Sequence, residues 1–115
     1  MFEHAIQAVG LAVVVYFVLR FVMAARARIP PDKAHALVEA GAQLVDVRSP
    51  AEFASGALPG AVNLPVQSLR QKMGELSKDS PVIVYCASGM RSARAASVLK
   101  SAGFEVHDLG PKAAW

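Results

Sequence analysis

The sequence predicts an α/β protein with a mainly parallel sheet, preceded by one N-terminal transmembrane helix. Segments typical of strands and of helices alternate between residues 32 and 109. Residues 82–85 (Val-Ile-Val-Tyr) are uninterrupted by polar side chains, as in a strand that is covered on both faces. Residues 5–25 are apolar on every helical face. These three patterns together define the predicted fold class.

The N-terminal segment is long enough to cross a bilayer. As a helix, residues 5–25 would be about 30 Å long at about 1.5 Å per residue, which matches the hydrocarbon core. Its strongly polar residues are Gln7 and Arg20, and Arg20 lies near one end, where its side chain can reach the head groups. We predict that residues 1–28 form a membrane anchor that contacts lipid through residues 5–25. A helix packed on the domain or on a second copy, and a cleaved signal peptide, are the alternatives.

The excess of positive charge lies next to the predicted span. The chain carries 12 Lys or Arg and 9 Asp or Glu, but residues 29–115 are nearly neutral, with nine basic and eight acidic side chains. The side chains of Arg20, Arg26, Arg28 and Lys33 are on the C-terminal side of the span, which the positive-inside rule assigns to the cytoplasm. We therefore predict a single-pass protein of the cell membrane with a cytoplasmic domain. No basic patch interleaved with aromatic residues is present, so no nucleic-acid partner is predicted.

The domain, residues 29–115, is predicted to alternate helices and strands. The expected order is helix 32–40, strand 44–48, helix 50–55, strand 61–64, helix 66–76, strand 82–85, a helix that starts at Arg91, and strand 105–109. Gly41 and Gly103 are typical of positions just past a helix end. Ser49 and Glu52 have the spacing of a capping box, with a proline at the first helical position.

The only cysteine of the chain, Cys86, directly follows the apolar strand. In open α/β sheets, ligands bind at the carboxyl ends of the strands. The small residues Ala87, Ser88 and Gly89 allow the backbone to curl so that its N–H groups point inward, and the following helix adds the positive end of its dipole. With Arg91 nearby, these features favour a thiolate that is nucleophilic near neutral pH. A lone cysteine is often a buried apolar residue, but packing does not require this combination, so we interpret Cys86 as functional.

Residues 85–92, Tyr-Cys-Ala-Ser-Gly-Met-Arg-Ser, resemble the active-site loop of the rhodanese sulfurtransferases. Residues 44–53 and 56–65 resemble the upstream signature of the same family. The resemblance implies a rhodanese-like three-layer sandwich and a cysteine, here Cys86, that carries a sulfane sulfur as a persulfide. This chain has Ala57 where the family usually has a histidine, a departure that leaves the nucleophile unchanged.

The length of the loop distinguishes this chain from related families of the same fold. Four residues separate Cys86 from Arg91, whereas the related dual-specificity phosphatases and arsenate reductases have a loop one residue longer, which fits a tetrahedral oxyanion. We therefore predict sulfur transfer with Cys86 as the catalytic residue. Arg91 would orient an anion or brace the loop through backbone carbonyls. The predicted substrate-binding residues are Ala87, Ser88, Gly89, Met90, Arg91 and Ser92.

The chain has no second cysteine, so it cannot resolve a persulfide into an internal disulfide. The predicted reaction takes a sulfane sulfur from a small-molecule donor such as thiosulfate and delivers it to an external thiol, cyanide or protein cysteine. The three histidines are scattered along the sequence, so neither a metal nor a cofactor is predicted. A membrane-tethered binding module without turnover is the main alternative, and an arsenate reductase or phosphatase is the less favoured one.

Five other residues are interpreted as structural. Asp46 and Arg48 alternate along a strand and can pair with each other. Arg48 is also expected to form an ion pair with Glu52 across the capping turn. His35 is expected on the exposed side of its helix, and Trp115 is expected to anchor the C-terminus by packing on the core.

Overall fold

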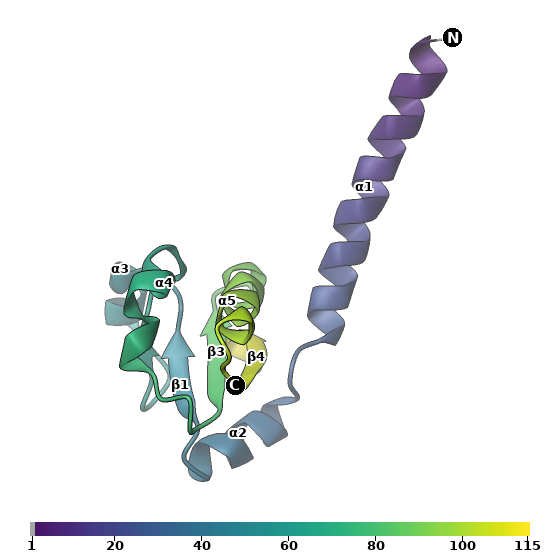
Figure 1. Ribbon diagram of the computed structural model, residues 1–115. Coiled ribbons are helices and arrows are strands. Elements are labelled where there is room, and N and C mark those ends of the chain that lie inside the picture. Colours follow the sequence, from purple (N-terminus) through teal and green to yellow (C-terminus); the bar gives the residue numbers. More distant parts are fainter. Residues whose placement is uncertain (1) are drawn as a thin grey trace.

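The computed structural model describes residues 2–115, and for residues 24–26 it describes only the backbone. Met1 and the side chain of Arg26, which belong to the predicted anchor and its basic cluster, lie outside the described residues. Figure 1 shows a long N-terminal helix, α1 (Phe2–Arg26), followed by a domain built around a sheet.

Helix α1 exposes its apolar side chains instead of packing on the domain. The window Phe2–Met23 is long and apolar enough to cross a membrane, and none of it is buried. This finding disfavours the alternative in which the helix covers the domain. A signal sequence near the N-terminus has the same character, so α1 is a candidate membrane span.

The domain contains a four-stranded sheet in the order β2-β1-β3-β4, and every neighbouring pair of strands is parallel. The strands are β1 (Gln43–Asp46), β2 (Val62–Asn63), β3 (Val82–Cys86) and β4 (Val106–Pro111). The helices are α2 (Pro31–Glu39), α3 (Pro50–Ser55), α4 (Leu69–Lys72) and α5 (Met90–Ser101), with short 3-10 turns η1 (Val66–Ser68), η2 (Met73–Glu75) and η3 (Lys112–Ala114). This architecture confirms the predicted α/β fold.

Strand β3 lies inside the sheet, and side chains on both of its faces are buried. Its alternate residues enter two different apolar clusters. Cys86 belongs to the first cluster, together with Leu99 of α5. Tyr85 belongs to the second cluster, together with Ala34 of α2. The sheet is therefore covered by helices on both faces, which is the expected three-layer arrangement and explains the uninterrupted apolar sequence of the strand.

The predicted helix 66–76 is divided into η1, α4 and η2. No side chain caps the start of any of the three pieces, and Gly74 weakens a helix by about 1 kcal/mol relative to alanine. Leu69 and Leu76 are nevertheless buried in the first apolar cluster. Tertiary packing therefore determines the path of this segment, whose own helical preference is weak.

The C-terminal segment returns over α2. The ring of His35 stacks on the ring of Trp115, with centroids 3.6 Å apart. His35 is partly buried, so its predicted exposure is wrong, because a residue distant in sequence covers that side of the helix. Trp115 packs against the second apolar cluster, which confirms its predicted role as an anchor.

Candidate active site

Cys86 is the last residue of β3 and is fully buried. Its Sγ accepts hydrogen bonds from the N–H groups of Gly89, at 2.9 Å, and of Ser92, at 3.4 Å. These donors belong to the loop after the strand and to the first turn of α5. Main-chain donors in this position can stabilise negative charge that develops beside the sulfur during a reaction. The predicted arrangement of strand, loop and helix around the cysteine is thus present.

The loop before α5 also carries donors without acceptors. Gly89 is the N-cap of α5 and has a φ of 99°, a left-handed conformation that favours glycine. Within residues 2–115, no hydrogen bond uses the N–H groups of Ala87, Ser88, Met90 and Arg91. These groups stand at the positive end of the α5 dipole. The loop therefore has the character of an anion-binding nest.

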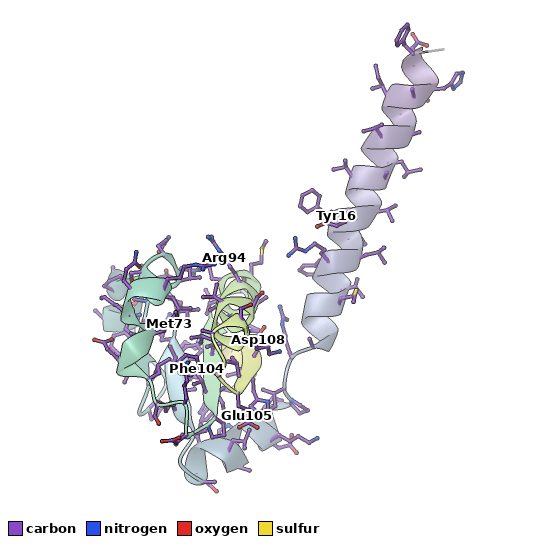
Figure 2. The ribbon with its side chains drawn as sticks, viewed as in Figure 1. Tyr16, Met73, Arg94, Phe104, Glu105 and Asp108 are labelled. Carbon is purple, nitrogen blue, oxygen red and sulfur yellow. The ribbon has the colours of Figure 1, made fainter. Side chains whose placement is uncertain are left out.

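The side chains of the loop contribute less to this nest than its backbone. The Ser92 hydroxyl is buried and donates to the Gly89 carbonyl at 3.1 Å, which ties the loop to the first turn of α5. The Met90 side chain is 70% exposed. Figure 2 shows Arg94, one turn further along α5, directed outward, and this residue is exposed as well. The polar groups directed at Cys86 are thus those of the main chain.

Arg91 braces the loop against α3. Its Nη1 lies 2.6 Å from Glu52 Oε1, and its Nη2 lies 3.0 Å from Glu52 Oε2. The hydrogen bonds from Arg91, helped by that from the Ser49 N–H, lower the pKa of Glu52 to about 2. The predicted ion pair between Arg48 and Glu52 is wrong, because the Glu52 carboxylate pairs with Arg91. The bracing role considered for Arg91 is present, through a carboxylate instead of backbone carbonyls.

Arg48 pairs with Asp46 at the carboxyl end of β1. Its Nη2 lies 2.7 Å from Asp46 Oδ2, and the two side chains are 8% and 0% exposed. The Arg48 N–H donates to Asp46 Oδ1 at 2.9 Å, a local bond that competes with the ladder and ends β1 earlier than the predicted strand 44–48. Arg48 Nη2 also donates to the Gly56 carbonyl at 2.7 Å. This pair is structural, because it joins β1 to the end of α3.

The histidines are spread over three elements. His4 belongs to α1, His35 lies against the C-terminal tryptophan, and His107 of β4 has its Nε2 3.7 Å from Glu105 Oε1. Within residues 2–115, no group of three or more His, Cys, Asp or Glu is arranged to hold a metal ion.

Sequence analysis placed Arg28 among the basic residues that follow the predicted span and missed its contact with the loop after Cys86. Its guanidinium lies against Gly89 of the loop and against Gly110 of β4. These glycines are far apart in the sequence, and they meet because β3 and β4 are neighbours. The sequence shows Gly89 and Gly110 near the ends of two strands, but it does not show that the Arg28 side chain lies between them.

The geometry around Cys86 agrees with one protein family. A family model described as the rhodanese-like domain matches residues 30–110. The chain belongs to the rhodanese-like domain family. The match begins after α1 and contains the whole Cys86 loop, so membership of the family concerns the rhodanese-like domain and leaves the N-terminal helix as an addition to it.

The rhodanese-like domain has named bacterial relatives. It is 43% identical over 83 residues to the thiosulfate sulfurtransferase GlpE of Stutzerimonas stutzeri, covering 71% of this chain and 76% of that protein. It is 45% identical over 69 residues to the protein YqhL of Bacillus subtilis, covering 59% of this chain and 55% of YqhL. The matched region thus spans about half the length of YqhL.

Solved structures show the same fold. The crystal structure of a rhodanese-related protein from Thermoplasma volcanium is similar with a TM-score of 0.66 and 29% identity, covering 74% of this chain and 83% of that chain. This similarity agrees with the parallel sheet and the helices on both of its faces.

Proposed function

We propose that this rhodanese-like protein is a membrane-anchored sulfurtransferase. It moves a sulfane sulfur from a donor such as thiosulfate to an external acceptor through a persulfide on Cys86. The observation that carries the proposal is the Cys86 Sγ, which accepts hydrogen bonds from Gly89 and Ser92 inside a loop with further free N–H groups. The name of the GlpE relatives, thiosulfate sulfurtransferase, supports a rhodanese-type enzyme.

In the first step, the Cys86 thiolate attacks the outer sulfur of thiosulfate. A bond from Sγ to this sulfur forms while the sulfur–sulfur bond of the donor breaks, and sulfite leaves with the electron pair of that bond. In the second step, the acceptor attacks the terminal sulfur of the persulfide, and the Cys86 thiolate leaves. The enzyme returns to its starting state, and no oxidant or reductant other than donor and acceptor takes part.

Each state of this reaction places negative charge inside the loop. The free N–H groups of Ala87, Ser88, Met90 and Arg91 would hold the thiosulfate, the persulfide and the departing sulfite. Donors that are oriented in advance need no rearrangement when charge moves, so they lower the barrier. The ion pair of Arg91 with Glu52 keeps the start of α5 in position, which preserves this orientation.

The acceptor comes from outside the chain. Cys86 is the only cysteine, so its persulfide cannot become an internal disulfide. Cyanide, a small thiol or the cysteine of a partner protein has the nucleophilic atom that the second step needs.

We assign residues 1–28 to the anchor and residues 29–115 to the catalytic domain. Helix α1 would contact lipid through residues 5–25, since its large apolar side chains are exposed. The basic residues after the span support a domain on the cytoplasmic side of the cell membrane, by the positive-inside rule.

Intact-protein mass spectrometry tests the persulfide directly. The full chain in detergent is incubated with thiosulfate, and we expect a gain of one sulfur, about 32 Da, that thiol reduction removes. Cys86→Ser is the control and should gain nothing. Absence of the gain, in a protein whose Cys86 still reacts with an alkylating reagent, would contradict sulfur transfer from thiosulfate and favour the tethered binding module. Turnover of arsenate or of a phosphate ester would favour the oxyanion alternatives.

A further inference from the structure

The juxtamembrane residue Arg28 is seated on the active-site loop. Its guanidinium contacts Gly89, and its Cδ and Nε lie 2.7 Å from the position of a Cβ added to Gly110. A side chain on either glycine would need the same space, so the two glycines form the groove that receives Arg28. The next residue is held as well, because the Ile29 N–H donates to the Asp108 carbonyl at 2.7 Å.

Arg91 forms an ion pair with Glu52, whereas Arg28 has no acidic partner within ion-pair distance in the described part of the chain. Within residues 2–115, Arg28 forms no ion pair, and its buried Nε has no hydrogen-bond partner. Arg91 is held at both of its terminal nitrogens by Glu52. The acidic group near Arg28 is Asp108, whose pKa is raised by burial while the charge of Arg28 opposes that rise. Its carboxylate accepts the Gly110 N–H at 2.8 Å and lies outside ion-pair distance of Arg28.

The guanidinium of Arg28 is also close to the sulfur. Gly89, which it contacts, is the residue whose N–H reaches the Cys86 Sγ at 2.9 Å. Gly89 therefore contacts the guanidinium on one side and the sulfur, through its N–H, on the other. A cavity of about 240 Å³ beside the loop is lined by Arg28, Gly89, Met90 and Ala93 on one side and by Phe17, Arg20 and Phe21 of α1 on the other.

We propose that Arg28 determines the preference of the Cys86 site for an anionic sulfur donor. Its free guanidinium attracts and positions the donor, while Arg91 holds the loop. This inference rests on the proposed sulfurtransferase function and deepens it, because it names the charge of the donor and the residue that selects it. It also makes the juxtamembrane segment a part of the active site.

Alkylation of Cys86 measures the charge at the sulfur without any sulfur donor. Iodoacetate is an anion and iodoacetamide is neutral, so the ratio of their rates with the full chain in detergent reports the local potential. We expect Arg28→Gln to lower this ratio about threefold, because one unit of positive charge beside the loop is removed. Arg28→Lys keeps the charge and should keep the ratio. Lys33→Gln is the matched control, because it removes one charge from an exposed position of α2.

Kinetics with thiosulfate connects this charge to the reaction. Because thiosulfate is a dianion, we expect Arg28→Gln to raise its KM about tenfold with a change in kcat of less than about twofold. Arg28→Lys should restore a KM close to that of the wild type.

Three results would overturn the role of Arg28. The first is an equal change of the iodoacetate and iodoacetamide rates in Arg28→Gln. The second is a fall of the iodoacetate-to-iodoacetamide ratio in Arg28→Lys to the value found for Arg28→Gln. The third is a wild-type ratio that does not fall as salt is added. The salt titration uses the unaltered chain, so it decides even where a variant fails to fold. If the wild type alkylates as expected but forms no persulfide with thiosulfate, the proposed function fails while the charge of Arg28 is still measured.

Discussion

The Glu52 carboxylate contacts two elements of the site at once. Its Oε1 accepts the Ser49 N–H at 3.2 Å, which closes the capping box of α3. Its two oxygens also accept hydrogen bonds from Arg91 at the start of α5. One acidic side chain therefore fixes a helix start and the active-site loop relative to each other.

This residue gives the protein a defined dependence of stability on pH. The pKa of Glu52 is lowered from 4.5 to about 2 by Arg91 and Ser49, so its stabilisation is fully present above pH 4.5 and is lost as the pH falls through about 2. We expect Glu52→Gln to lower the urea midpoint at pH 7 and to weaken the acid dependence in that window. Glu75→Gln, at an exposed position, is the control. An acid dependence in Glu52→Gln equal to that of the wild type would contradict this assignment.

The buried pair of Asp46 and Arg48 makes a second prediction at the level of residues. The hydrogen bonds that Arg48 donates to the Asp46 carboxylate raise the pKa of Arg48, and both side chains are shielded from water. Asp46→Asn leaves a buried guanidinium without its counter-charge, so we expect the free energy of unfolding to fall by about 3–5 kcal/mol. Asp79→Asn is exposed and should change it by less than about 0.5 kcal/mol. Urea unfolding measures both, and equal midpoints for wild type and Asp46→Asn would refute the assignment.

The connection between β3 and α5 depends on the backbone of Gly89. Its φ of 99° lies in the left-handed region, and a Cβ there would meet the Arg28 guanidinium. We expect Gly89→Ala to lower the free energy of unfolding by about 1–2 kcal/mol from backbone strain alone. Alkylation of Cys86 should also slow, because the Gly89 N–H is directed at Sγ.

A second glycine provides the control for this prediction. A Cβ on Gly74 would meet no atom within 4 Å, so Gly74→Ala should leave stability unchanged or raise it by about 0.4–1 kcal/mol. Urea unfolding and the iodoacetamide rate measure the two effects. Wild-type values of both in Gly89→Ala would show that the loop does not need the left-handed turn.

At the scale of the whole molecule, the loop after Cys86 lies close to the end of the candidate span. Arg28 is five residues beyond Met23, where the apolar window ends, and an extended chain of that length reaches at most about 18 Å. Arg28 also contacts the loop that follows Cys86. An α1 that spans a membrane, as we propose, would hold the Cys86 loop near the membrane surface.

Insertion of α1 can be tested by placing a charge in its middle. Val14→Asp puts a carboxylate near the bilayer centre, which costs about 2.5–3.5 kcal/mol. We expect the wild type to stay with membranes during alkaline extraction and Val14→Asp to be partly released. Val14→Leu is the control. Complete release of the wild type would rule out a transmembrane anchor.

The side of the membrane can be read from one introduced thiol. Cys86→Ser combined with Arg70→Cys leaves a single cysteine at an exposed position of α4. We expect a membrane-impermeant maleimide to label it in inverted vesicles and not in intact cells, because the basic residues after the span favour a cytoplasmic domain. Labelling of intact cells would place the domain on the opposite side.

Local patterns were sufficient for the fold class and for the position of Cys86 at the end of a buried strand. The apolar run of β3, the single cysteine after it and the small residues of the loop are adjacent in the sequence, and each has a direct conformational meaning. The prediction of one helix over residues 66–76 was wrong, because the helical preference of this segment is weak and the packing of Leu69 and Leu76 determines its path. The prediction for His35 was also wrong, because a distant aromatic residue covers it.

By itself, the sequence determined the alternation of strands and helices, the apolar N-terminal segment, and the position of Cys86 between a buried strand and a loop of small residues. Only the tertiary structure decided the partner of each charge. Arg91 and Glu52 are 39 residues apart, and Arg28 meets Gly89 and Gly110 because β3 and β4 are adjacent. Periodicity reports which face of an element is buried, whereas an ion pair depends on which elements become neighbours in space.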